Sequence, residues 1–328
     1  MMLKQEIYTQ KDSTPVKKRI LFSLIIPVYN VERYVEICLD SIVSQLKEDI
    51  EVICINDGST DGSGVVLSNY CHYPNFIVIS TENRGQGAAR NIGIKAASGA
   101  YILFIDGDDF IDVNYLSDLR KLVEPYLENE DLDLILVGAK RFDDKKKIFL
   151  PDVPYYRTAN YGAHGLCDQE VVYARVFEKF APFFKIQRRR FILQQNLFYD
   201  EGVRFEDVVP HVKALLSAKK ILISDLASYY YRFNRAGSTM NSSYDIKKIS
   251  DVFKFLLRVR EVLKQMGLFS RFRQSYYIFF KNQVKFHLQK VKPSQRPYVL
   301  AFSKILLMLF VVVDSSSKHL SSQKIIVS

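Results

Sequence analysis

Short apolar runs alternate with longer amphipathic segments over the first 140 residues of the chain. The runs are rich in Ile and Val and mostly lack strict polar–apolar alternation, which is typical of buried, largely parallel strands. The predicted strands are residues 22–26, 50–55, 76–79, 101–105 and 132–137. Helical spacing of apolar residues follows the first run and recurs over residues 86–98, with Gly99 at the helix end. This alternation predicts a doubly wound α/β sheet with right-handed crossovers.

The chain beyond residue 140 is less regular. Residues 140–165 carry charge, proline and tyrosine without periodicity, and we expect an irregular excursion over the sheet edge. Residues 171–198 show an aromatic helical pattern, and residues 245–290 predict one or two basic amphipathic helices. Residues 298–313 are 16 mostly apolar positions interrupted by Lys304. Because a helix needs about 20 such residues to span a bilayer, we expect it to pack or to lie in a membrane interface.

The composition fits a globular intracellular protein. A length of 328 residues with 48% apolar content is enough for a full α/β domain with a smaller second unit. The four cysteines show no Cys-x-x-Cys spacing, and the first 20 residues contain no apolar segment. We therefore expect reduced, mostly buried thiols, no signal peptide or N-terminal anchor, and a cytoplasmic location.

The net charge of +10 is unevenly distributed along the chain. Residues 1–150 have a net charge of −6, residues 151–207 are neutral, and residues 208–328 carry +16. A basic C-terminal third indicates an anionic partner, either a membrane surface or a polyanion, unless it is only a solvated helical face. The chain lacks the organised aromatic and basic motif of a nucleic-acid reader, so we expect no nucleic acid as partner.

The predicted strand 101–105 ends in three carboxylates within four residues, namely Asp106, Asp108 and Asp109 around Gly107. Like charges crowded at a strand end repel one another unless a cation lies among their oxygens, and Mg²⁺ and Mn²⁺ prefer such ligands. The glycine permits a tight turn beside a ligand. We interpret this segment as a metal and diphosphate site at the carboxyl edge of the sheet, with a solvated acidic turn as the alternative.

Three other predicted strands also end in unusual residues. Tyr29 offers a ring that can stack on a flat base, and Asp57 offers a carboxylate that can accept a hydrogen bond from a base N–H. Asp61 is placed to cap the next helix. Residues 82–91 form a glycine loop that opens a helix, whose N-terminus favours anions. Each loop alone could be a turn or a cap, but together on one edge they fit a nucleoside diphosphate.

The order of these segments carries a family resemblance. The chain resembles family 2 glycosyltransferases of the bacterial surface-polysaccharide type, which have the GT-A fold. The resemblance covers residues 21–140 closely and continues loosely to about residue 235. It rests on Pro27-Val28-Tyr29-Asn30, Asn56-Asp57-Gly58-Ser59-x-Asp61, Arg84-Gly85-x-Gly87-x-x-Arg90-Asn91 and Asp106-Gly107-Asp108-Asp109.

The resemblance implies roles for these residues. In the family, residues at these positions hold the base of a nucleotide sugar, usually uracil, and its ribose or sugar. The expected donor-binding residues are Pro27, Tyr29, Asp57, Arg90 and Asp106. Asp108 is the expected ligand of a divalent metal, Mn²⁺ or Mg²⁺, that bridges the diphosphate, and Asp109 is a lesser candidate. A cation there stabilises the negative charge that develops on the departing diphosphate.

Residues 203–209 resemble the family's acidic pair, whose aspartate lies beside the acceptor. Asp207 is the expected general base, with Glu206 as the fallback, and attack opposite the diphosphate would give inversion. The alternative is an ordinary acidic helix N-terminus. His211, four residues further, could join the metal site. Lys185 and Arg232 could touch phosphate or acceptor, although packing roles are favoured for both.

The expected organisation follows from these assignments. The fold class is α/β, with a mainly parallel mixed GT-A sheet flanked by helices and a basic helical C-terminal extension. Residues 1–20 form a tail, residues 21–140 the nucleotide-sugar half, residues 141–240 the acceptor half with the base, and residues 241–328 the basic helical region.

The expected function is inverting, metal-dependent transfer of a hexosyl or N-acetylhexosaminyl group in polysaccharide biosynthesis. The donor is a nucleotide sugar, UDP-linked by the resemblance, and the acceptor is a glycan or lipid-linked glycan at the inner face of the cell membrane, where the enzyme would be peripheral. A sugar nucleotidyltransferase is an alternative, but residues 27–30 lack its glycine-rich Arg and Lys loop. A non-catalytic nucleotide-sugar-binding protein is another. Hydrolase and ATPase motifs are absent from the sequence.

Overall fold

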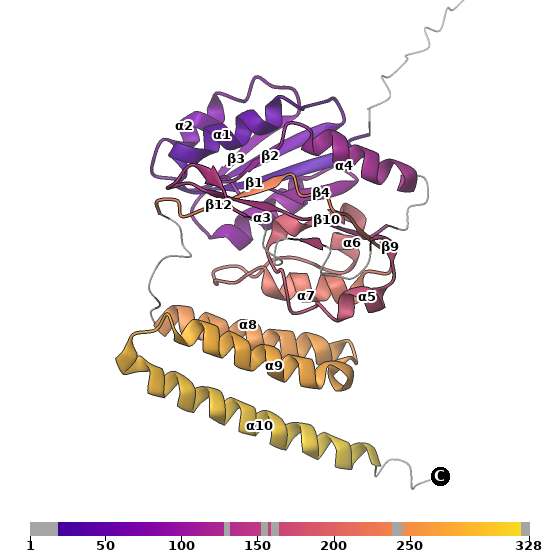
Figure 1. The fold of residues 1–328 in the computed structure, drawn as a ribbon, viewed down its shortest axis with the longest axis vertical. Helices are drawn as coiled ribbons and strands as arrows, with labels where there is room; N and C mark the ends of the chain where they lie inside the picture. The colour runs from indigo at the N-terminus through magenta and orange to yellow at the C-terminus, as the bar shows by residue number, and fades with distance from the viewer. Residues whose placement is uncertain are drawn as a thin grey trace, which may run out of the picture.

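The computed structural model describes residues 19–127, 132–151, 157–158, 164–237, 244 and 246–322. Figure 1 shows a large twisted sheet with helices on both faces, and a layer of long helices from the C-terminal part of the chain below it. The eight-stranded sheet has the order β3-β2-β1-β4-β10-β6-β11-β9. A four-stranded sheet of order β5-β12-β7-β8 lies beside it.

The first half of the large sheet is entirely parallel. Three of its four strands are buried on both faces by helices, which explains their continuous apolar runs, whereas the edge strand β3 is partly exposed. The strands are β1 (Phe22–Val28), β2 (Ile50–Asp57), β3 (Phe76–Thr81) and β4 (Tyr101–Phe104). The helices are α1 (Glu32–Val43), α2 (Ser63–Ser68), α3 (Gln86–Ala96), α4 (Tyr115–Val123) and the 3₁₀ turn η1 (Glu124–Tyr126).

The second half of the sheet is mixed. β10 is antiparallel to both β4 and β6, β11 is parallel to β6, and β9 pairs antiparallel at the edge. The strands are β6 (Leu134–Leu136), β9 (Gly165–Cys167), β10 (Lys185–Arg188) and β11 (Ile221–Ile223). The helices are α5 (Gln169–Tyr173), η4 (Pro182–Phe184), α6 (Arg189–Gln194) and α7 (Val208–Ser217). The predicted mainly parallel α/β sheet is therefore confirmed.

The hydrophobic core has two layers, one on each face of the large sheet. Side chains from α1, α2 and α4 pack on one face together with Leu24 and Ile26 of β1. Side chains from α3, α6 and α7 pack on the other face with Ile25, and this layer continues into the C-terminal helices. Alternate residues of one strand thus pack into opposite core layers, because successive side chains of a strand point to opposite faces of the sheet.

The expectation of an irregular excursion over residues 140–165 is wrong for its first part. Residues 140–149 form a hairpin in the small sheet, whose strands are β5 (Phe110–Ile111), β7 (Lys140–Asp143), β8 (Ile148–Phe149) and β12 (Tyr229–Phe233). Phe142 packs edge-on against Phe110 and Phe149, which stabilises the hairpin. The charged turn 144–147 conceals this short apolar pattern. Residues 152–156 and 159–163 lie outside the described part.

The expected helical pattern over residues 171–198 is also interrupted. Residues 185–188 form β10 in the middle of the sheet, between β4 and β6. Lys185, Gln187 and Arg188 are polar and yet buried there, so the strand lacks the apolar signature on which prediction depends. Arg188 lies over the ring of Tyr101, 5.4 Å from its centroid.

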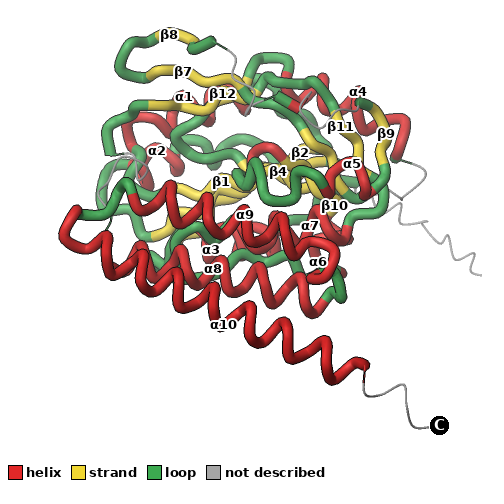
Figure 2. Tube along the Cα trace, turned by 60° about the horizontal axis from the view of Figure 1, so that its bottom comes forward, coloured by secondary structure: helices red, strands yellow, loops and turns green. Residues whose placement is uncertain are grey.

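The C-terminal region is helical, as predicted. Its helices are α8 (Ile246–Gln265), α9 (Phe269–Leu288), the 3₁₀ turn η6 (Pro293–Gln295) and α10 (Arg296–Ser322). Gly267, with a φ of 70°, turns the chain between α8 and α9. α8 packs against α7 and α9, and α10 packs against α9 (Figure 2). Within the described residues, the length and apolar character needed to cross a bilayer are not found together in any helix.

Candidate active site

The carboxyl ends of β1, β2 and β4 bring the predicted site segments to one edge of the sheet. β1 lies between β2 and β4, so the segments that follow these three strands are neighbours. Gly107 approaches the carbonyl oxygen of Pro27 so closely that an added Cβ would lie 3.1 Å from it. Pro27 lies inside β1, which continues to Val28, and the Tyr29 side chain beyond it is 48% exposed at the edge.

Asp57 fastens the glycine loop to the sheet edge. It is the last residue of β2 and is buried. One carboxylate oxygen accepts the backbone N–H of Arg84 at 2.8 Å, and the other accepts that of Gly85 at 2.9 Å. Gly85 has a φ of 89°, in the left-handed region that favours glycine. The carboxylate thereby fixes the loop that opens α3.

Asp61 was expected to cap α2, but the N-cap of that helix is Gly62, and Asp61 binds the first helical N–H from one residue earlier. Its Oδ1 accepts the backbone N–H of Ser63 at 3.0 Å, and its Oδ2 accepts that of Glu32 at 3.1 Å. The Glu32 carboxylate in turn accepts the N–H of Gly62 at 2.9 Å. The starts of α1 and α2 are therefore joined next to Tyr29 by reciprocal hydrogen bonds to orphan N–H groups.

Arg90 joins the segment that follows β4 to the segment that precedes α7. Its guanidinium donates to Asp106 at 2.8 Å and to Glu206 at 2.7 Å, and the side chain is only 2% exposed. Burial alone would lower the pKa of Arg90, but the Asp106 and Glu206 carboxylates raise it above its ordinary value. Arg90 is therefore a permanent cation held between two carboxylates that are 100 residues apart in sequence.

Gly87 allows α3 to approach the acceptor-side loop. A Cβ at this position would overlap the carbonyl oxygen of Asp200 and would lie 3.2 Å from Cγ of Glu206. Asn91, one turn further along α3, donates to the carbonyl of Tyr199 at 3.0 Å and accepts its N–H at 2.8 Å. These contacts hold the loop over residues 199–206 against the donor half.

The carboxylates after β4 have different surroundings. Asp109 is fully buried and accepts hydrogen bonds from the Tyr229 hydroxyl at 2.6 Å and the Arg232 N–H at 2.7 Å. Burial raises the pKa of Asp109 well above its ordinary value, and the charges of Asp108 and Asp106 raise it further. Asp109 thus connects the site segment to β12 and is engaged by the protein on both oxygens.

Asp108 pairs with an arginine that the sequence analysis missed. Its Oδ2 accepts a hydrogen bond from Nε of Arg235, and its backbone carbonyl accepts one from Nε of Arg232 at 2.7 Å. Burial raises the pKa of Asp108, against the lowering effect of Arg235. No motif in the sequence singles out Arg235, which lies two residues before Gly237.

The donor set at Asp108 fits a divalent cation. Mg²⁺-type ions are commonly held by one or two carboxylates together with substrate phosphates, without a complete cage of protein ligands. Within the described residues, no group of three His, Cys, Asp or Glu side chains could hold a metal without substrate phosphates. Asp108 supplies hard oxygen ligands at the sheet edge, with its side chain 18% exposed.

Asp207 stands at the N-cap of α7, next to Glu206. Burial raises the pKa of Asp207 above its ordinary value, and the positive charges of Arg90 and Lys185 oppose that increase. Burial likewise raises the pKa of Glu206, against the effect of Arg90. Glu206 is tied to Arg90 by the hydrogen bond described above. Asp207 is therefore the member of the pair better suited to accept a proton.

A buried lysine and histidine lie behind Asp207. Lys185 Nζ contacts the carbonyls of Phe180 and Ala181 and Nδ1 of His211, each at 2.9 Å. Burial lowers the pKa of Lys185 to about 7, although Asp207 acts to raise it. Burial also lowers the pKa of His211 well below its ordinary value, so its neutral ring can accept from the ammonium. His211 thus contacts Lys185, and the Lys185 side chain is only 3% exposed, which leaves it little access to a phosphate.

The fold and the gathering of these segments along one sheet edge are those of the GT-A class. The profile of glycosyl transferase family 2 matches residues 23–201, more than half of the 328 residues. The chain therefore belongs to glycosyl transferase family 2.

Two relatives and one solved structure are informative. The uncharacterized glycosyltransferase EpsJ of Bacillus subtilis is 32% identical over 65% of this chain and 61% of its own length. The poly(ribitol-phosphate) β-N-acetylglucosaminyltransferase TarS of Staphylococcus aureus is 28% identical over 68% of this chain, which spans 37% of TarS. The chain thus spans less than two thirds of either relative.

The crystal structure of S. aureus TarS 1-349 in complex with UDP-GlcNAc superimposes with a TM-score of 0.62 at 22% identity. The match covers 87% of this chain and 88% of that one. At this identity the likeness establishes the fold, and it confirms the predicted GT-A architecture.

Proposed function

We propose that this protein is an inverting glycosyltransferase that moves a hexosyl or N-acetylhexosaminyl group from a UDP-linked donor to a glycan or lipid-linked glycan. The observation that carries the proposal is the Arg90 bridge, because it joins a donor-side carboxylate, Asp106, to the acceptor-side Glu206 at one sheet edge. Polymer-modifying enzymes among the relatives, such as TarS, support a surface-polysaccharide acceptor.

In this proposal the donor's uracil lies at Tyr29 and Asp57, and its ribose or sugar lies near Asp106. Asp207 takes the proton of the acceptor hydroxyl as that oxygen attacks the anomeric carbon. The bond to the diphosphate breaks on the opposite face, which inverts the configuration in one displacement. The raised pKa of Asp207 favours proton acceptance, and Arg90 keeps Glu206 engaged beside it.

Asp108 would hold a divalent cation, Mn²⁺ or Mg²⁺, together with the diphosphate. The cation would supply charge neutralisation for the departing UDP. Because Arg235 donates to the same carboxylate, its side chain would shift from Asp108 when the cation binds.

The proposed division of labour follows the chain. Residues 21–140 bind the donor, residues 141–240 supply the base and the acceptor side, and residues 241–328 attach the enzyme peripherally to the inner face of the cell membrane. The charge of +16 over residues 208–328 supports that attachment, because the cytoplasmic leaflet and a diphosphate-linked carrier are both anionic.

The test is a panel of nucleotide sugars with Mn²⁺, given to wild type, Asp108→Ala and Asp207→Ala. Release of nucleoside diphosphate by wild type supports the proposal. We expect Asp108→Ala to lose the metal-dependent activity, and Asp207→Ala to bind donor normally and lose transfer. Equal activity in all three would refute both roles. Pyrophosphate formation would indicate a nucleotidyltransferase, and binding without turnover would indicate a non-catalytic protein.

A further inference from the structure

Helix α10 is apolar on two faces, and only one of them is covered. Its inner face packs toward α9 through the buried Ser303 and Phe310. Its outer face exposes large apolar side chains at helical spacing, each more than 50% accessible: Tyr298, Ile305, Met308 and Leu309. A helix that is apolar all round is normally buried. The outer face of α10 therefore calls for a further apolar partner.

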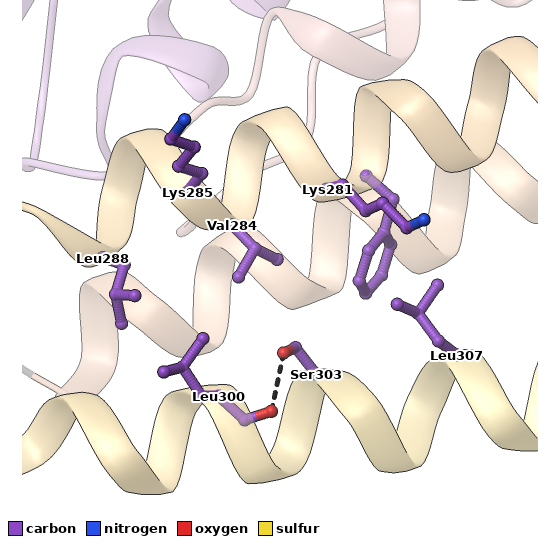
Figure 3. A pocket seen from close by; sticks show the side chains of 8 residues that line it. Lys281, Val284, Lys285, Leu288, Leu300, Ser303 and Leu307 are labelled. Atoms are coloured by element: carbon purple, nitrogen blue, oxygen red, sulfur yellow. Dashed lines mark hydrogen bonds between the residues drawn. The ribbon is translucent and has the colours of Figure 1, made fainter.

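Helix α9 exposes apolar side chains as well. Ile278 and Phe286 are 53% and 48% exposed on that helix. Between α9 and α10 runs a groove of about 210 Å³, into which Val284, Leu288 and Leu300 point (Figure 3). Lysine side chains stand along its α9 side. We call the exposed residues of α9 and α10 the outer helical face.

The charge around the outer helical face has one sign. Residues 262–313 contain nine Lys and Arg and not one Asp or Glu. Lys281, Lys285 and Lys304 are exposed beside the apolar side chains. A second copy of this face would bring like charges together, which opposes self-association through it. An anionic lipid surface satisfies both features, because its headgroups attract lysine and its acyl region receives apolar side chains.

We propose that the outer helical face docks on an anionic phospholipid bilayer, with α10 lying in the plane of the headgroups. This deepens the membrane attachment in the proposed function by assigning it a surface and residues. The apolar boundary of the bilayer meets Ile305, Met308 and Leu309, and the lysines contact lipid phosphate. α10 then lies on the membrane and does not cross it, in keeping with its lysine at position 304.

The docked layer is connected to the acceptor side of the active site. Arg258 of α8 forms an ion pair with Asp200, and the Asp251 carboxylate accepts the backbone N–H of Arg204 at 3.4 Å. Residues 200 and 204 belong to the loop that carries Glu206. A bilayer bound at α10 would therefore hold the acceptor side of the enzyme at a fixed position relative to lipid-linked substrates.

The test measures binding of the full chain to phosphatidylcholine vesicles with and without phosphatidylglycerol, by co-sedimentation at low and high salt. One variant, Ile305→Ser/Met308→Ser/Leu309→Ser, removes apolar contact with the bilayer. Another, Lys281→Gln/Lys285→Gln/Lys304→Gln, removes charge. Matched controls are Val65→Ser/Val113→Ser, which are 68% and 70% exposed on the catalytic domain, and Lys121→Gln/Lys147→Gln.

We expect wild type and both controls to bind only vesicles with phosphatidylglycerol, and less at high salt. The charge variant should lower the partition coefficient about 100-fold, since each of its three lysines contributes about 1 kcal/mol. The apolar variant should also lower it, because it removes three side chains that would enter the bilayer. Circular dichroism should show unchanged helix content, and UDP-sugar hydrolysis in solution should stay at the wild-type rate.

Three results would overturn the inference: no binding of wild type to anionic vesicles, equal binding by the variants, or a wild-type dimer in sedimentation velocity that the apolar variant dissociates. The last would assign the face to a second copy. Vesicle binding without any donor turnover would instead leave the docking intact and remove the proposed function.

Discussion

The active-site edge and the outer helical face depart from ordinary protein anatomy in opposite directions. At the edge, charged groups are buried, as with Arg90 between Asp106 and Glu206. On α10, large apolar groups are exposed, as with Met308 at 67%. Neither arrangement lowers the free energy of folding by itself. Burying a charge carries a desolvation penalty, and an exposed apolar side chain gains no hydrophobic stabilisation. Such departures are typical of functional sites, where residues are selected for binding and not for stability.

The comparison separates two kinds of mutational effect. Replacing a buried charged group by a neutral one of the same shape should reduce catalysis more than stability. The exception is a replacement that leaves an oppositely charged partner buried without its counter-charge, which should also reduce stability. Replacing an exposed apolar group on α10 should change membrane binding and leave both stability and catalysis as they were. The following variants test the buried side, from the largest expected effect to the smallest.

Asp207→Asn should reduce sugar transfer about 1,000-fold, because the amide cannot take the acceptor proton. Donor affinity measured by calorimetry should not change, since the proposed donor contacts lie elsewhere. The exposed Asp118→Asn on α4 is the matched control. Transfer at the wild-type rate by Asp207→Asn would exclude Asp207 as the general base. Glu206→Gln would then test the fallback candidate.

Arg90→Met should lower the free energy of unfolding by about 3 kcal/mol, because it leaves two buried carboxylates without their cation. Urea denaturation measures this. The triple variant Arg90→Met/Asp106→Asn/Glu206→Gln should recover most of the stability and remain inactive. If the triple variant were as unstable as the single one, packing of the arginine, and not its charge, would account for the loss.

Lys185→Met should change the pH dependence of both activity and stability. The ammonium near Asp207 lowers the pKa of that carboxyl, so its removal should shift the acid limb of kcat to higher pH. Arg90 and Asp106 also act on Asp207 and remain in place. A kcat profile from pH 5 to 9 measures the shift, with Lys213→Met on α7 as control. An unchanged profile would reduce Lys185 to a packing residue.

The stability of the same variant has a definite sign. The pKa of Lys185 is lowered to about 7 in the folded protein, while the unfolded side chain titrates near 10.4. Between these values the unfolded chain binds more protons, so wild-type stability should rise with pH. Lys185→Met should therefore exceed wild type most below pH 7, and the advantage should shrink above it. A melting temperature measured across this range checks the trend.

Arg235→Gln should have the smallest effect of the series. Because Arg235 occupies the carboxylate of Asp108, its removal should tighten Mn²⁺ binding without donor by about threefold, the scale of a partly exposed ion pair. Electron paramagnetic resonance titration of Mn²⁺ measures the affinity, and Arg120→Gln, which pairs with Asp49 away from this carboxylate, is the control. Weaker Mn²⁺ binding would show that the arginine positions Asp108 for the metal.

Sequence reasoning succeeded where burial was complete and local. The strands β1, β2 and β4 are buried on both faces, so their apolar runs are visible in the sequence. Since parallel strands end at a common edge, the convergence of Tyr29, Asp57 and Asp106 followed from the strand prediction.

The missed features depend on contacts between distant segments. β10 is a strand with buried Lys185, Gln187 and Arg188, and its polar side chains find partners that no local pattern reveals. The roles of Gly87 and Arg235 arise from neighbours more than 100 residues away in sequence, at Asp200 and Asp108. Such roles require the fold to be known first.

The central position of β10 has a consequence for the synthesis and the truncation of the chain. The strand lies between β4 and β6, so the sheet stays divided until residues 185–188 have left the ribosome. A fragment that ends near residue 140 would leave β4 with an unpaired edge, open to pairing with other chains. The donor-binding motifs are contiguous in sequence, yet a truncated protein carrying only them should aggregate during expression.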